Sequence, residues 1–165
     1  MKQITVLGIG NILLQDEGFG VKIIEELQRR YRFANNLRLI DGGTLGMDLL
    51  RFITGTTNLL VVDAIDGGGA PGSLYRFAND EVKAYFRNKV SLHELGIKDV
   101  LAVLEVLDEP IAEVVVIGVQ PQVLELGLEL TPIVASMMDK TIDAVIDQLK
   151  EWQINVGVAD ETVTY

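Results

Sequence analysis

The sequence predicts a single three-layer α/β domain, in which a mostly parallel, twisted sheet carries helices on both faces. Two observations predict this fold class: short apolar runs rich in β-branched residues recur along the chain, and amphipathic helical segments lie between them. No repeat, linker or low-complexity segment divides the 165 residues. We therefore expect one domain over residues 1–152, followed by a tail at 153–165 for which the sequence gives no structural prediction.

The first half of the chain follows a strand–helix–strand–helix–strand pattern. The first strand is expected over Ile4–Ile9, because this run is apolar and Gly10-Asn11 ends it. Apolar residues at helical spacing then predict a helix over residues 20–31, with Asp16 or a nearby residue as its cap. The remaining elements of this half are a strand at 37–41, a short helix at 47–53 and a strand at 59–63.

A short connection sets the direction of the next strand. Residues 64–72 contain four Gly and one Pro, and this segment is too short for the crossover that a parallel strand needs. The strand expected at 73–77 is therefore antiparallel. The predicted order is completed by helical segments at 80–86 and 97–107, a buried strand at 114–119, and a closing helix at 132–152 whose apolar stripe includes Ile133.

The composition restricts the possible partners. The chain has 14 Lys and Arg against 24 Asp and Glu, so its net charge is −10 and nucleic acid is not an expected partner. No apolar run approaches the roughly 20 residues that cross a bilayer, and no signal-peptide cleavage pattern follows the first apolar run. The apolar face of each predicted element is needed to form the core of the domain, which leaves no apolar face for contact with a second copy. We therefore expect a cytoplasmic monomer without membrane insertion.

The absence of Cys and the presence of a single His, His93, define the metal chemistry that is open to the chain. Without Cys there is no disulfide, zinc ribbon, iron–sulfur cluster or thiol nucleophile. Any metal site must draw its other side-chain ligands chiefly from carboxylates. A set of carboxylates and one imidazole suits Ni, Zn, Co or Mn.

Carboxylates follow three of the predicted parallel strands. Glu17 follows the first strand, Asp41 closes the second and Asp63 closes the third. In open α/β sheets, functional groups gather beyond the carboxyl ends of the strands, where the strand order reverses. With a local order 2-1-3, Glu17 and Asp63 face the same crevice, and a loop can add His93. Strand-end acids also cap helices, and a lone loop His is often only solvated, so the spacing alone leaves both interpretations open.

A glycine pair after the first strand also invites a dinucleotide-binding interpretation. Gly8-Ile-Gly10 has the expected position, and Asp41 lies where a ribose-binding acid would be. The third glycine of that fingerprint is absent, because position 13 is Leu. Asp16 and Glu17 would also place negative charge where the pyrophosphate binds. A nucleotide-binding domain is therefore a minor alternative.

Five short motifs occur along the chain, within a stretch from about Ile4 to Leu149. They are Gly8-Ile-Gly-Asn-Ile-Leu-Leu-Gln-Asp-Glu-Gly-Phe-Gly20, Ile40-Asp-Gly-Gly-Thr-Leu-Gly46, Val62-Asp-Ala-Ile-Asp66, Ser91-Leu-His-Glu94 and Gly118-Val-Gln-Pro121. In content and order they resemble the hydrogenase maturation endopeptidases. The resemblance implies a protease that removes the C-terminal extension of a nickel–iron hydrogenase large-subunit precursor after nickel insertion. It also implies a five-stranded sheet with one antiparallel strand, which we place in the order 2-1-3-5-4.

The resemblance further assigns residues to the site. Glu17, Asp63 and His93 match the metal-binding residues of the family, and we expect them to act both as metal ligands and in catalysis. Asp41 and Gly42 match a segment beside the cleft that helps to hold the substrate. The metal is nickel, expected mainly as bound in the substrate precursor, although Zn or Cd can occupy the same site. The alternative function is a noncatalytic nickel-binding maturation chaperone, which would use the same three ligands without cleavage.

Overall fold

The computed structural model describes residues 2–43, 48–87, 101–102, 105 and 110–159. Its main sheet has five strands in the order β3-β1-β4-β6-β5. Their bounds are β1 (Ile4–Ile9), β3 (Leu37–Gly43), β4 (Asn58–Ala64), β5 (Leu74–Ala78) and β6 (Glu113–Val119). This arrangement confirms the predicted order 2-1-3-5-4. It also confirms that the strand after the short glycine-rich connection is antiparallel, because β5 pairs with β6 in that direction.

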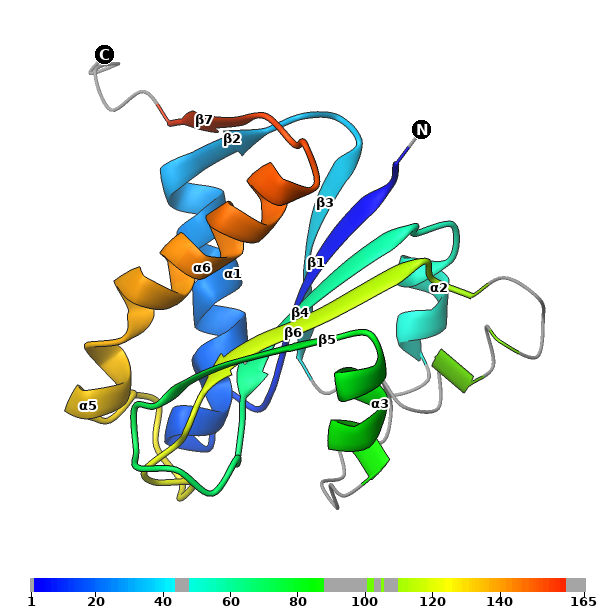
Figure 1. The fold of residues 1–165 in the computed structure, drawn as a ribbon. Coiled ribbons are helices and arrows are strands. Elements are labelled where there is room, and N and C mark those ends of the chain that lie inside the picture. Colours follow the sequence, from blue (N-terminus) through cyan, green and yellow to red (C-terminus); the bar gives the residue numbers. More distant parts are fainter. Residues whose placement is uncertain (1, 44–47, 88–100, 103–104, 106–109, 160–165) are drawn as a thin grey trace, which may run out of the picture.

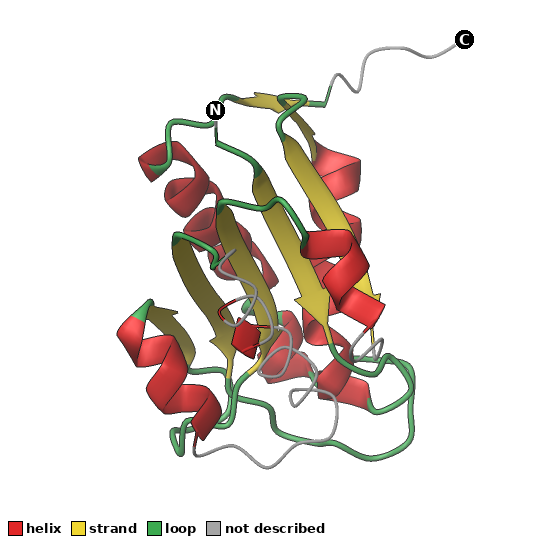
Figure 2. Cartoon of the chain, turned by 90° about the vertical axis from the view of Figure 1, so that its right-hand side faces the viewer, coloured by secondary structure: helices red, strands yellow, loops and turns green. Residues whose placement is uncertain are grey.

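The parallel strands end at a common edge of the sheet, and this edge carries two of the predicted site residues. Asp41 of β3 pairs in register with Gly8 of β1, and Asp63 of β4 lies opposite Gly118 of β6. Figure 2 shows loops gathered beyond the arrowheads of these strands. This edge is where an open α/β sheet places its functional groups.

Helices cover both faces of the sheet, as predicted (Figure 1). One face carries α1 (Phe19–Arg30) and α6 (Met138–Glu151), and the other carries α2 (Leu49–Ile53) and α3 (Asp80–Arg87). Most of the helix predicted at 97–107 lies outside the described residues. Among the described residues, no helix combines the length and the hydropathy needed to cross a lipid bilayer.

The strands contribute to a separate hydrophobic core on each face. In β4, Leu60 and Val62 belong to the core shared with α1 and α6. Leu59 and Val61 belong to the core shared with α2 and α3. All four side chains are fully buried, which explains why this strand appears in the sequence as a continuous apolar run rather than an alternating one.

The sequence does not predict a second, two-stranded sheet that the structure contains. β2 (Tyr31–Phe33) pairs antiparallel with β7 (Val156–Val158), and the N–H of Ala159 donates to the carbonyl oxygen of Arg30 at 2.8 Å. The helix predicted at 20–31 ends one residue earlier than expected, because Tyr31 has extended backbone and begins β2.

The prediction of one continuous closing helix at 132–152 is wrong. The structure has α5 (Pro132–Ala135) and α6, separated by residues 136–137. The hydroxyl of Ser136 donates to the carbonyl oxygen of Ile133 at 2.6 Å, and the N–H of the next residue donates to the carbonyl oxygen of Val134 at 3.0 Å. This tighter bonding interrupts the helix. Ile133 is exposed whereas Val134 is buried, so the predicted apolar stripe does not continue through the break.

Candidate functional site

Close packing holds the turn that carries Glu17 over the carboxyl edge of the sheet. This turn, η1 (Gln15–Gly18), is a short 3-10 helix that precedes α1 and contacts β4. A Cβ at Gly20, in the first turn of α1, would lie 2.6 Å from the carbonyl oxygen of Ile9 and would overlap that of Val62. Glycine permits this approach, which brings η1 down onto the ends of β1 and β4.

Gly10 lies against the backbone of Glu17 and close to the side chain of Asp63, two of the predicted ligands. Its φ of 129° is a value that L side chains rarely adopt. A Cβ at this position would overlap the carbonyl oxygen of Glu17 and would lie 3.8 Å from Oδ1 of Asp63. The structure therefore brings Glu17 and Asp63 close to one backbone position at the end of β1.

The two carboxylates differ in their environment. Only 1% of the surface of Asp63 is exposed, and its Oδ1 accepts the N–H of Ala64 at 2.8 Å. Glu17, on η1, is only partly buried. A buried carboxylate is unfavourable unless hydrogen bonds or a cation compensate for its lost hydration. The pair thus combines a carboxylate fixed within the sheet with one that solvent or a ligand can reach.

A cleft of about 320 Å³ opens at Gly10, and two more of its lining residues, Asp41 and Gly43, come from the end of β3. Glu17 and Asp63 approach the cleft through Gly10 and do not line it themselves. Asp41 is exposed and supplies the carboxylate of the cleft. Gly42 is buried, and a Cβ there would lie 2.6 Å from Cδ1 of the core residue Leu7. Because the side-chain position of Gly42 faces the core, this residue can offer a substrate only its backbone.

His93 lies outside the described residues. Its position relative to Glu17 and Asp63 therefore stays a prediction. Within the parts of the chain that the structure describes, no group of three or more His, Cys, Asp or Glu side chains is placed to hold a metal ion. The described site thus contains two of the three predicted ligands.

Asp16 has a role that the sequence did not reveal. Asp16 itself does not cap α1, because the N-cap is a nearby residue, Gly18, and no side chain makes the capping hydrogen bond. The buried carboxylate instead binds a distant loop. Oδ2 accepts the N–H groups of Gln122 and Val123 at 2.8 and 3.0 Å, and Oδ1 accepts the N–H of Thr131 at 2.8 Å. These partners are 106 to 115 residues away, so no local pattern could have indicated them.

These hydrogen bonds also set the ionisation of Asp16. Burial raises the pKa of its carboxyl group, but the N–H groups of Val123, Thr131 and Gln122 and the hydroxyl of Thr131 lower it by more, so the pKa lies below the ordinary value of 3.8. The ionised carboxylate holds the segment 122–131 beside η1.

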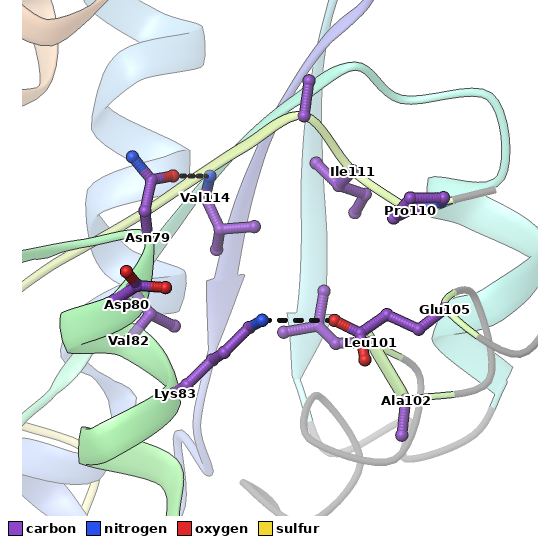
Figure 3. A pocket seen from close by; sticks show the side chains of 11 residues that line it. Asn79, Asp80, Val82, Lys83, Leu101, Ala102, Glu105, Pro110, Ile111 and Val114 are labelled. Carbon is purple, nitrogen blue, oxygen red and sulfur yellow. Dashed lines mark hydrogen bonds and ion pairs between the residues drawn. The ribbon is translucent and has the colours of Figure 1, made fainter. Parts of the chain in front are cut away.

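A larger cavity lies away from the carboxyl edge and contains no predicted site residue. Its volume is about 500 Å³, and it lies between α3 and the start of β6, where Ile111 and Val114 contribute apolar surface. Figure 3 shows Lys83 and Glu105 facing each other there, with an ion pair of 3.3 Å. Val114 and Asp63 lie near opposite ends of the paired strands β6 and β4. The smaller cleft is the candidate site, because Asp41 lines it and so does Gly10, which Glu17 and Asp63 approach.

Solved structures that share this fold include two hydrogenase maturation proteases. The hydrogenase maturating endopeptidase HybD from Escherichia coli matches with a TM-score of 0.91 and 38% identity, over 96% of this chain and 98% of that chain. The NiFe hydrogenase maturation protease HybD from Thermococcus kodakarensis matches with a TM-score of 0.75 and 26% identity, over 90% of this chain and 99% of that chain.

Sequence comparisons agree with the structural ones. Hydrogenase 2 maturation protease from Escherichia coli K12 is 41% identical over 150 residues, which cover 90% of this chain and 92% of that protein. The hydrogenase expression/formation protein HupD from Bradyrhizobium diazoefficiens is 42% identical over 157 residues, covering 94% of this chain and 82% of that protein. The fold and these similarities define a protease of the α/β class. A family model described as hydrogenase maturation protease matches residues 21–148, and the chain belongs to this family, as the sequence motifs predicted.

Proposed function

We propose that this chain is an endopeptidase that removes the C-terminal extension of a nickel–iron hydrogenase large-subunit precursor after nickel insertion. Family membership supports proteolysis. The names of the relatives, such as Hydrogenase 2 maturation protease, support a hydrogenase as the target. The observation that carries the proposal is the approach of Glu17 and Asp63 around Gly10, beside an open cleft at the carboxyl edge of the sheet.

In this proposal Glu17, Asp63 and His93 recognise the nickel that the precursor already holds. Carboxylate oxygens and an imidazole nitrogen are ligands that Ni²⁺ accepts, and Zn²⁺ or Cd²⁺ can use the same donors. Nickel is then part of the substrate, and the three side chains complete its coordination when the precursor docks. This contact would hold the neighbouring peptide bond in the cleft and make cleavage depend on nickel insertion.

We assign the activation of water to Asp41. A carboxylate that binds a metal ion is a poor base, whereas Asp41 is exposed, lines the cleft and is not one of the proposed ligands. Water would attack the carbonyl carbon of the scissile bond while Asp41 accepts its proton. Transfer of that proton to the leaving nitrogen then breaks the bond into a carboxylic acid and an amine. Gly42 would hold the substrate through its backbone.

Mass spectrometry of the purified precursor, before and after incubation with the protein, tests this function. We expect loss of the extension from nickel-loaded precursor and no change in nickel-free precursor. Asp63→Asn and His93→Ala should each abolish cleavage. The matched control is Asp147→Asn, because Asp147 is an exposed acid on α6, and it should cleave as the wild type does. Full cleavage by either ligand variant would contradict the proposed site.

The same experiment separates the alternative function. A noncatalytic nickel chaperone would bind the nickel-loaded precursor and leave its mass unchanged. Binding is therefore measured in parallel, under the conditions of the cleavage assay.

A further inference from the structure

An exposed aliphatic surface borders the candidate site. It consists of Ile12 and Leu13, in the loop after β1, and of Leu124, Leu126 and Leu128, in the segment between β6 and α5. We call these five side chains the leucine surface. Leu126 is 84% exposed and Leu128 is 65% exposed. Single exposed apolar residues are common, but a contiguous group of them usually marks a site of interaction.

Backbone hydrogen bonds join the two segments that carry the leucine surface, although these segments lie far apart in the sequence. Leu14 and Gly127 form a parallel bridge. The N–H of Gly127 donates to the carbonyl oxygen of Leu13, and the N–H of Gln15 donates to that of Gly127, both at 2.9 Å. The two segments therefore form one ledge, which lies beside the start of α1 in Figure 1.

The backbone of the segment that carries Leu124, Leu126 and Leu128 is held in a defined conformation. Asp16 binds the backbone of the segment at both of its ends, through Gln122 and Thr131. Between them, the ammonium group of Lys22 donates to the carbonyl oxygen of Leu128 at 2.6 Å. A buried carboxylate and a lysine thus fix backbone whose leucine side chains remain in solvent. A preorganised surface of this kind loses little conformational entropy when a partner binds.

The leucine surface continues into the cleft. Ile12 and Leu13 line the cleft together with Asp41, so a chain bound on the ledge leads directly to the candidate site. The surroundings are acidic, because Glu125 and Glu129 are exposed beside the leucines. The ammonium group of Lys22 is engaged by the loop itself. A partner suited to this surface is aliphatic and carries Lys or Arg.

We propose that the leucine surface is the docking surface for the precursor protein, where it binds an aliphatic segment flanked by basic side chains. This inference rests on the proposed function and extends it from the cleaved bond to the region that holds the substrate. Docking on the leucine surface would contribute affinity for the precursor, while Glu17, Asp63 and His93 recognise nickel and Asp41 takes part in cleavage.

Steady-state cleavage of the nickel-loaded precursor tests the inference. The double variant Leu126→Ser with Leu128→Ser removes the two most exposed leucines, and the matched control is Val158→Ser. Val158 is also highly exposed, but it lies on β7, at the other end of the molecule (Figure 1). We expect KM to rise about tenfold in the double variant, with kcat changing by less than about twofold, because the lost contacts are remote from the reacting bond. The control should match the wild type.

A second pair of substitutions tests the charge of the partner segment. Glu125→Gln with Glu129→Gln should lower kcat/KM at low salt and flatten its dependence on ionic strength. An unchanged salt dependence would overturn the basic character assigned to the partner.

The outcomes distinguish this inference from the function on which it rests. No cleavage by the wild type would overturn both, whereas cleavage with the same KM in wild type and double variant would overturn the docking surface alone. Light scattering and flotation with anionic phospholipid vesicles examine other occupants. A wild-type dimer that the double variant converts to a monomer would assign the surface to self-association. Vesicle binding that the double variant loses would assign it to lipid, and either result would overturn the proposal.

Discussion

The Oδ1 atom of Asp16 accepts the backbone N–H of Thr131 at 2.8 Å, across 115 residues of sequence. Both residues are buried. Because Asp16 is followed directly by Glu17, the turn that carries one proposed nickel ligand also anchors the loop that carries three of the exposed leucines. The docking surface and the candidate site are therefore parts of one structural unit.

Asp16→Ala should destabilise the protein by about 3 kcal/mol, because it leaves several backbone N–H groups without their charged acceptor. The measurement is urea unfolding at pH 7, followed by circular dichroism. Asp147→Asn on α6 is the control and should stay within about 0.5 kcal/mol of the wild type. A wild-type midpoint for Asp16→Ala would show that the loop does not depend on this carboxylate.

The stabilisation by Asp16 should disappear in acid. The pKa of this group is lower in the folded protein than its ordinary value of 3.8, so the unfolded chain takes up the proton first as the pH falls. Its contribution is therefore complete above the ordinary pKa and is lost as the pH falls through the folded value. We expect the difference in unfolding free energy between wild type and Asp16→Ala to be constant from pH 7 to pH 5 and to shrink below pH 4. A difference that grows in acid would reverse the assigned direction.

Gly10→Ala should impair both stability and cleavage. The new methyl group would overlap the carbonyl oxygen of Glu17, in a backbone conformation that alanine disfavours, at a cost of about 2 kcal/mol or more. Displacing Glu17 should lower kcat/KM for nickel-loaded precursor at least about tenfold. Gly157→Ala is the control, since its Cβ would lie 3.7 Å from the nearest atom, the carbonyl oxygen of Arg32. Thermal melts and cleavage assays on both variants provide the comparison.

Asp41→Asn should lower kcat by about 10² to 10⁴, the usual contribution of a general base, and should leave KM nearly unchanged. Because Asp41 is exposed, the melting temperature should stay at the wild-type value. Single-turnover cleavage of nickel-loaded precursor separates the chemical step from binding. A variant that retains the wild-type rate would require another group to accept the proton.

Strand positions were predictable because their signal is local. β4 is buried along its whole length, so its residues 59–62 form a continuous apolar run, which ends at Asp63. The short connection to β5 fixed the antiparallel direction by its length alone. The approach of Glu17 to Asp63 could be anticipated in the same way, because strand order determines which strand ends are neighbours.

Other features depend on partners that no local pattern reveals. β2 and β7 have three residues each, which is too short for a periodic signal, and each exists because it pairs with the other. The break before α6 occurs where Val134 is buried and Ile133 is exposed. Both residues are apolar and β-branched, so only tertiary packing determines which of them is buried. The role of Asp16 also depends on tertiary structure, because a carboxylate can accept hydrogen bonds equally well from a helix N-terminus or from a distant loop.

Two glycines of the candidate site, Gly10 and Gly20, occupy positions where main-chain segments pack against each other. A side chain at Gly10 or Gly20 would collide with backbone that belongs to the site itself, so these positions tolerate almost no variation. Leu124, Leu126 and Leu128 are free of that constraint, because their side chains are exposed and do not belong to the core. The protease could therefore be redirected to a different precursor by substituting the exposed leucines while Gly10 and Gly20 are kept. Divergence among proteases with different targets would follow the same route.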